Sequence, residues 1–254
     1  MANSYKWELY NVAKDWTQDN DVGKAEPKKL KELQDLFWVE AAKYLVLPLD
    51  NSSIIRALEP RPSLTAGRDE FTYTRPISGI PFGDAPNILA RSFSITAKVE
   101  VPKEGIEGML NTIGGRFGGY GLYVLKGKPV FTYNLCDFAR FRWEGKDALT
   151  PGKHTITFDV TYDGPGPAKG GTGELKVDGN SVDFKKIPHT ALLAFIVDES
   201  FDVGSDSGSP VDGKDYQCPF CFTGKLNKLT VKLGPLQLRP AEKKEIEKKN
   251  REKD

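Results

Sequence analysis

The sequence predicts a mainly β fold, a jelly-roll or concanavalin-like β-sandwich. From position 93, apolar Phe93, Ile95 and Ala97 alternate with polar residues, which is typical of a half-buried strand. The composition agrees, because 25 Gly and 17 Pro accompany 14 Phe and 9 Tyr. Many short strands, separated by Gly- and Pro-rich turns with no helix between them, favour a sandwich or jelly roll.

Alternation and turn residues place the strands in order along the chain. Two hairpin turns are expected, at Lys126-Gly127-Lys128 and at Asp178-Gly179-Asn180. We predict a short strand around residues 71–74 and further strands over residues 93–101, 121–126, 130–135, 141–143, 154–162, 174–177, 182–184, 192–197 and 225–233. Aromatic side chains along them, from Phe93 to Phe222, would form the core.

The first 47 residues differ from this pattern. Trp7 and Leu9 predict a strand over 4–12, and apolar residues at helical spacing after Pro27 predict a helix that ends before Pro48. One strand and one helix cannot bury all their apolar surface. We therefore expect Trp7 and the Phe37-Trp38 pair to pack on another domain. The predicted divisions are 1–47, a linker over 48–90, the sandwich over 91–238 and a charged helical tail over 239–254.

Composition excludes several function classes. The formal net charge is +1, whereas nucleic-acid binders are usually strongly basic, so no nucleic-acid partner is expected. No apolar run approaches the roughly 20 residues of a membrane span, so no membrane partner is expected either. The residues after Met1 do not resemble a secretory signal. The compartment, and whether Met1 is the true start, stay open.

Two stretches are candidate binding sites. The glycine-dense run 114–121 lacks the order of a dinucleotide-binding loop, and strands rather than a helix follow it. It is either a close crossing of strands or a rim that brings Arg116 and Tyr120 to a ligand. The acidic loop 198–215 is either a solvated loop or a calcium site, since Ca²⁺ takes several oxygen ligands. Its candidate metal ligands are Asp198, Glu199, Asp202 and Asp206.

Cysteine and histidine give little support for catalysis. Cys218 and Cys221 have the C-x-x-C spacing of a redox or zinc pair, but a strand follows them where a redox pair needs a helix. Two small apolar side chains beside a strand are the alternative. His154 and His189, the only histidines, stand in no nucleophile motif, and a hydrogen-bonded His at a strand end is favoured. We assign no catalytic residue.

Several segments together resemble the arylsulfatase-type sulfatases, and in particular a large bacterial subgroup. Residues 6–11 (Lys-Trp-Glu-Leu-Tyr-Asn) and the helix after them are similar to the end of the sulfatase domain. The stretches 79–87, 114–134, 140–145, 151–156, 198–204 and 219–226 resemble the linker and accessory domain. The resemblance covers nearly the whole chain, although none of its motifs is catalytic.

The resemblance implies that the chain is the C-terminal portion of an arylsulfatase, a sulfuric ester hydrolase. Its first 47 residues would then be a strand–helix remnant of an α/β sulfatase domain. The partners would be the missing catalytic domain and a sulfated substrate or glycan. Formylglycine and Ca²⁺ would act in the parent enzyme, and this chain alone would hold no cofactor and be inactive. The alternative is a stand-alone, lectin-like sandwich that binds a glycan or a protein through Arg116, Tyr120 or the acidic loop. A third hypothesis is a thiol-redox protein.

Overall fold

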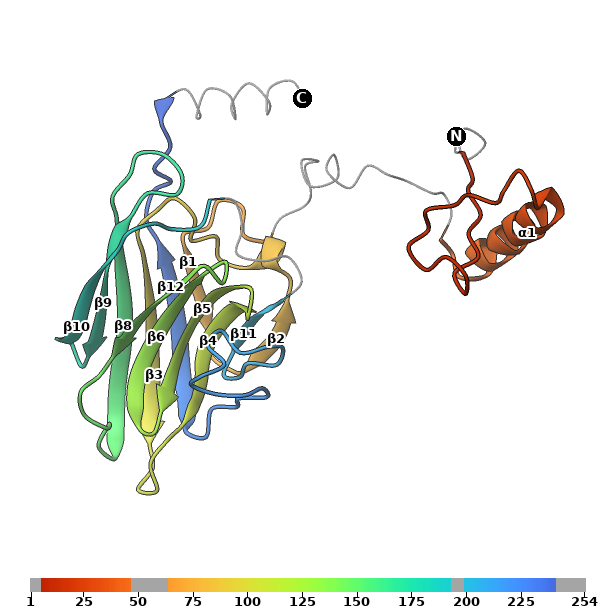
Figure 1. The fold of residues 1–254 in the computed structure, drawn as a ribbon. Helices are drawn as coiled ribbons and strands as arrows, with labels where there is room; N and C mark the ends of the chain where they lie inside the picture. The colour runs from red at the N-terminus through yellow and green to blue at the C-terminus, as the bar shows by residue number, and fades with distance from the viewer. Residues whose placement is uncertain (1–5, 47–63, 193–198, 241–254) are drawn as a thin grey trace. The chain divides into compact units, whose positions relative to one another are not determined.

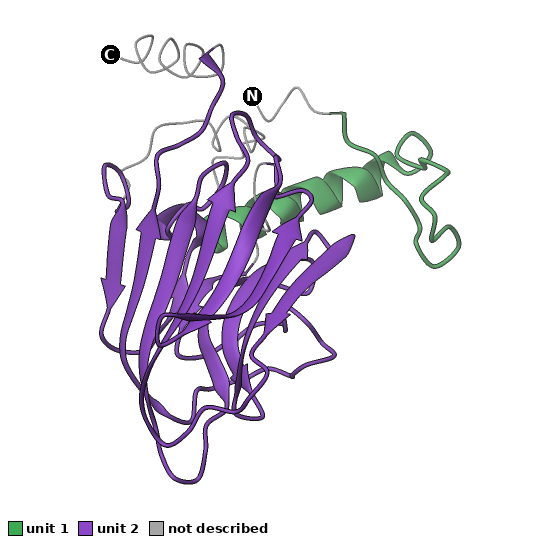
Figure 2. Cartoon of the chain, turned by 90° about the vertical axis from the view of Figure 1, so that its left-hand side faces the viewer, with its two compact units in different colours: residues 1–62 green, residues 63–254 purple. Residues whose placement is uncertain are grey.

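The computed structural model describes residues 6–46, 64–192 and 199–240. The chain divides into two compact units, residues 1–62 and 63–254, which Figure 2 colours separately. No helix in the described ranges is long and apolar enough to cross a membrane.

The first unit contains the helix α1 (Pro27–Lys43), which confirms the predicted helix. Trp7 packs edge-on against Phe37, with ring centroids 5.3 Å apart, and Phe37 packs against Trp38 at 5.2 Å. The strand predicted over 4–12 is absent from its described part, 6–12. The Leu9 amide donates to the Asp21 side chain at 3.0 Å, so no neighbouring strand receives that amide. Alternation alone does not supply the partner strand that a ladder needs.

The second unit is a sandwich of two six-stranded antiparallel sheets, so the predicted fold class is confirmed (Figure 1). The first sheet, sheet A, has the order β1-β12-β3-β8-β9-β10. Its strands are β1 (Glu70–Tyr73), β12 (Lys225–Leu233), β3 (Phe93–Val101), β8 (Gly152–Tyr162), β9 (Gly171–Val177) and β10 (Asn180–Ile187). The second, sheet B, has the order β2-β11-β4-β5-β6-β7. Its strands are β2 (Ile77–Ile80), β11 (Phe201–Val203), β4 (Gly108–Gly115), β5 (Gly118–Leu125), β6 (Lys128–Leu135) and β7 (Ala139–Glu144). A short 3₁₀ turn, η2 (Phe82–Asp84), follows β2.

Aromatic side chains fill the space between the sheets. Phe131 from sheet B stacks on Phe158 from sheet A, with ring centroids 3.5 Å apart. Trp143 packs edge-on against Phe158 at 5.0 Å, and its indole N–H donates to the Gly173 carbonyl at 3.0 Å. All three rings are fully buried, and the only polar group among them, the Trp143 N–H, is paired, so this cluster holds the two sheets together.

Three strands were not expected from the sequence, whereas β1 confirms the short strand predicted around residues 71–74. β2 falls inside the same predicted linker and is only four residues long at a sheet edge, which is too short for a clear alternation. β4 was hidden by its glycines. A Cβ on Gly114 would lie 2.1 Å from the Gly118 carbonyl oxygen, so the glycine-dense run is a close strand crossing. β11 has three residues. The strand predicted over 192–197 and the tail after 240 lie outside the described residues.

Candidate functional site

The outer face of sheet B is covered by the protein itself. We call residues 204–224, between β11 and β12, the covering segment. Within this segment, the Tyr216 ring stacks on the Phe220 ring, with centroids 4.5 Å apart. The Tyr216 ring also lies 5.3 Å from the ring of Tyr123 on β5. Met109 and Tyr123 are fully buried beneath it. This second apolar cluster occupies the sheet face that would otherwise be open to a ligand.

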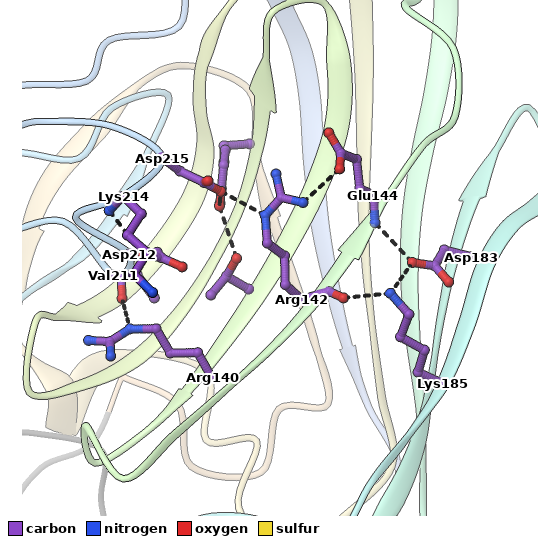
Figure 3. A network of polar contacts seen from close by, with 11 residues as sticks. Arg140, Arg142, Glu144, Asp183, Lys185, Val211, Asp212, Lys214 and Asp215 are labelled. Atoms are coloured by element: carbon purple, nitrogen blue, oxygen red, sulfur yellow. Dashed lines mark hydrogen bonds and ion pairs between the residues drawn. The ribbon is translucent and has the colours of Figure 1, made fainter.

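Ion pairs fasten the covering segment to strand β7 (Figure 3). Arg142 Nε donates to Asp215 Oδ2 at 2.8 Å, and its Nη1 donates to Glu144 at 2.7 Å. The hydroxyl of Tyr123 donates to the same Asp215 carboxylate. Because these groups neutralise and hydrogen-bond one another, a ligand here would have to displace partners that already exist.

Two further residues, Arg140 and Lys185, extend this network at the sheet edge, as Figure 3 shows. Arg140 Nε donates to the Val211 carbonyl at 3.1 Å and holds the tip of the covering segment. Lys185 on β10 contacts Asp183 at 2.7 Å and donates to the Arg142 carbonyl at 2.8 Å, which ties β10 to β7. We interpret the whole network as structural: it holds the covering segment and β10 to β7, and it is not a binding site.

The acidic loop does not gather its carboxylates around one point. Asp198 lies outside the described residues. Glu199 accepts from the Ser209 hydroxyl at 2.7 Å, whereas the fully buried Asp202 accepts from the Gly79 amide at 2.9 Å. In the described part of the chain, no three or more His, Cys, Asp or Glu residues are grouped to hold a metal ion. These carboxylates organise the loop instead.

Asp206 and Cys218, both within the covering segment, lie next to each other. Burial raises the pKa of Asp206 above its usual value, although the Tyr216 hydroxyl donates to it at 2.6 Å. Burial, together with the Asp206 carboxylate, raises the pKa of Cys218 to about 12. A redox thiol needs a lowered pKa, so Cys218 is not suited to that chemistry with Cys221.

The structure separates the two predicted ligand-binding residues. Arg116 is exposed on the β4–β5 turn, with its guanidinium 5.6 Å from the Phe117 ring centroid. Tyr120 is fully buried between the sheets and stacks 5.7 Å from Phe131. The expectation that Tyr120 reaches a ligand from a rim is therefore corrected: it faces the core because β5 alternates inward at that position.

A His–Asp pair lies where β8 begins and β9 ends. These strand ends are at the lower end of the sandwich in Figure 1. His154 Nδ1 lies 2.7 Å from Asp178 Oδ2, and His154 Nε2 lies 2.8 Å from the Thr150 carbonyl oxygen. The Thr155 amide donates to Asp178 Oδ1 at 2.7 Å. Burial would raise the pKa of Asp178, but the hydrogen bonds from Thr155 and His154 outweigh it and lower the pKa. Asp178 is therefore ionised at neutral pH.

This pair forms one wall of a cleft of about 380 Å³, which we call the His154 cleft. The loop 145–150 and the β9–β10 turn form its sides. The Leu149 amide donates to the Gly127 carbonyl at 2.9 Å, which fixes the loop. Asp178 and Gly179 both have positive φ, as a two-residue type I′ hairpin turn requires, which fixes the other side. Its apolar lining is Pro129, Ala148, Leu149, Val177 and Val182, and its polar lining includes Lys146, Asp147, Thr150, His154, Asp178, Asn180 and Ser181.

Two hollows adjoin the His154 cleft. One, of about 520 Å³, shares Ala148 and Leu149 with it and is otherwise lined by residues of the β3–β4 and β5–β6 loops and by Thr223. The other, of about 270 Å³, shares His154 with it and contains three lysines, so we call it the lysine hollow. The His154 cleft and its two neighbouring hollows were not predicted from the sequence, because His154 and Asp178 come together only through the pairing of β8 with β9. The predicted turn at 178–180 is the signal that could have located them.

Comparisons with known proteins find the fold but no family. No family model and no curated protein matches the chain. Among solved structures, the CBM40 of the Ruminococcus gnavus IT-sialidase is 13% identical, with a TM-score of 0.42 over 68% of this chain and 95% of that one. Mouse laminin α1 LG4-5 is 13% identical, with a TM-score of 0.40 over 63% and 39%. The leech intramolecular trans-sialidase is 10% identical, with a TM-score of 0.42 over 68% and 26%. At these values the likeness extends to the sandwich fold and no further.

These findings correct the family expectation. The similar structures include a sialidase CBM40 and receptor-binding domains, and no sulfatase family model or curated sulfatase matches the chain. The interpretation of the chain as a C-terminal portion of an arylsulfatase, a sulfuric ester hydrolase, is therefore wrong, and no finding supports a sulfatase-domain partner.

Proposed function

We propose that the second unit is a carbohydrate-binding module whose sugar site is the His154 cleft. The observation that carries the proposal is the ionised Asp178, paired with His154 on one wall of a cleft that has an apolar lining as well. A sugar ring has hydroxyls at its edge and C–H groups on its faces, so its site needs both kinds of wall.

Asp178 retains hydrogen-bonding capacity in this arrangement. Each of its oxygens accepts one bond, from Thr155 or from His154, and a carboxylate offers about four lone-pair sites. The remaining lone pairs are available to sugar hydroxyls. Asn180 adds an exposed amide, which both donates and accepts, to the lining. Charge-assisted bonds of this kind are roughly twice as strong as neutral ones.

The size of the cleft favours a sugar over a protein. About 380 Å³ lies within the range of small-ligand sites, roughly 300–1,000 Å³. A stable protein–protein interface buries about 800 Å² on each partner and is built around apolar anchors. The alternation of polar and apolar residues over a short cleft suits one or two sugar units.

The test is a glycan screen with the full chain, followed by calorimetry of Asp178→Asn. Asn tolerates the positive φ of the turn and still accepts from Thr155, so the hairpin is kept. We expect at least a tenfold loss of affinity, about 1.4 kcal/mol. Asp163→Asn is the matched control, because both carboxylates have 46% exposed side chains and Asp163 lies beyond the far end of β8. Absence of any bound glycan, or equal affinities for the two variants, would contradict the proposal.

A further inference from the structure

The lysine hollow lies beside the proposed sugar site with His154 as their common wall. It is formed by neighbouring strands of sheet A, where β3 pairs with β8 on one side and with β12 on the other. Its lining is Lys98, Val99, Glu100, Lys153, His154, Thr155, Lys225 and Asn227. Lys153 and His154 are consecutive strand residues and point to opposite faces of sheet A. A ligand that occupies both depressions therefore passes around the beginning of β8, where they share His154.

The hollow carries excess positive charge. Glu100 is its one carboxylate, and it pairs with Lys225 at 3.6 Å. Lys98 and Lys153 are exposed and form no ion pair with any residue that the structure describes. Because strand pairing holds these residues in register, the two ammonium groups are carried on adjacent strands around one depression.

The two depressions therefore differ in sign. In the His154 cleft the carboxylates of Asp147 and Asp178 outnumber the one lysine, Lys146, which disfavours an anion. In the lysine hollow three lysines outnumber Glu100, which favours one. We propose that the module recognises an acidic glycan, with an uncharged sugar unit in the His154 cleft and an adjoining unit's oxyanion in the lysine hollow. The oxyanion is a carboxylate or a sulfate ester, which share the same charge and acceptor chemistry. This inference rests on the proposed function.

The lysines are exposed, so their contribution should be modest and sensitive to salt. Charges in water are screened over about 8 Å at physiological ionic strength, and exposed ion pairs are individually weak. We expect Lys98→Gln/Lys153→Gln to weaken binding of an acidic oligosaccharide about three- to tenfold at low salt. Binding of its neutral counterpart should be unchanged.

The experiment is calorimetry of the full chain with three oligosaccharides of equal length, which carry a carboxylate, a sulfate ester or neither. The control variant is Lys186→Gln/Lys232→Gln, which removes the same formal charge from the other end of sheet A. Tighter binding of either acidic probe, lost in Lys98→Gln/Lys153→Gln but kept in the control, supports the inference. The preferred probe identifies the oxyanion.

Three other outcomes have distinct meanings. Equal binding of the acidic and neutral probes overturns the acidic subsite and leaves the proposed function standing. Binding of an acidic probe that is insensitive to Asp178→Asn overturns the shared surface, because the lysines would then act alone. Binding of no probe, together with no hit in the glycan screen, overturns both.

Discussion

The outer face of sheet B and the lower end of the sandwich contain similar polar residues that do different things. On the sheet face they hold the covering segment in place, and at the lower end they border a cleft. On the sheet face, Asp215 of the covering segment accepts hydrogen bonds from both Arg142 and Tyr123. At the lower end, Asp178 and His154 are paired too, but the pair borders a cleft. A polar network therefore does not itself indicate a binding site. What distinguishes the two is whether acceptors remain that a ligand can reach.

The largest effect should come from removing the main apolar anchor of the covering segment. Tyr216→Ala deletes a buried ring that stacks on Phe220 and a hydroxyl that donates to Asp206. Truncation of a buried aromatic residue typically costs about 3–5 kcal/mol. Urea unfolding should show this loss of stability, and Phe117→Ala, at an exposed ring, should change stability by less than about 0.5 kcal/mol. An unchanged Tyr216→Ala variant would mean that the segment does not stabilise the sheet.

A matched pair of substitutions compares the two networks directly. Asp215→Asn removes the charge that Arg142 and Tyr123 share, and the Asp215 side chain is only 14% exposed. We expect a loss of about 1–3 kcal/mol, typical of hydrogen bonds to charged groups. Asp178→Asn should cost no more than about 1 kcal/mol, as for other exposed pairs. Chemical denaturation of both variants measures the difference, and a larger loss for Asp178→Asn would reverse our assignment of the two regions.

The sequence was sufficient to predict that the fold is a sandwich of two sheets, but insufficient to predict what lies on the surface of those sheets. The alternation in Phe93–Val101 and the two Gly-containing turns predicted β3 and two hairpins that the structure contains. Strand β4 was not predicted, because glycines replace the alternating side chains where two backbones approach closely. The covering segment was not predicted, because no local sequence pattern shows that Tyr216 packs on Tyr123, 93 positions earlier.

The candidate site was missed for a related reason. His154 was expected to be a hydrogen-bonded strand-end residue, and the structure confirms this, but its partner depends on the β8–β9 register. Tyr120 shows the converse. A glycine-rich neighbourhood suggests an exposed rim, whereas the pleat of β5 turns that ring into the core. The family resemblance failed because turn-rich strings such as 79–87 meet general requirements of β-turns and carry little information on ancestry.

The pH dependence of stability should have opposite signs in the two regions. Burial raises the pKa of Asp206 above its usual 3.8, so its contribution to stability is fully present below that pH and is lost as pH rises through the folded-state value. Hydrogen bonds from Thr155 and His154 lower the pKa of Asp178 despite its partial burial. Its contribution is therefore present above 3.8 and lost as pH falls through the folded-state value.

Unfolding free energies measured from pH 3 to pH 7 test this contrast. The stability of the wild type minus that of Asp206→Asn should decrease with rising pH, because Asn cannot ionise. The same difference for Asp178→Asn should increase and then level off above the usual carboxyl range. Of all the effects predicted here, the change of stability with pH that Asp178 causes should be the smallest, since solvent screens an exposed carboxylate. Slopes of the same sign would show that Asp206 is stabilised as an anion, and the covered face would then resemble the open end in its electrostatics.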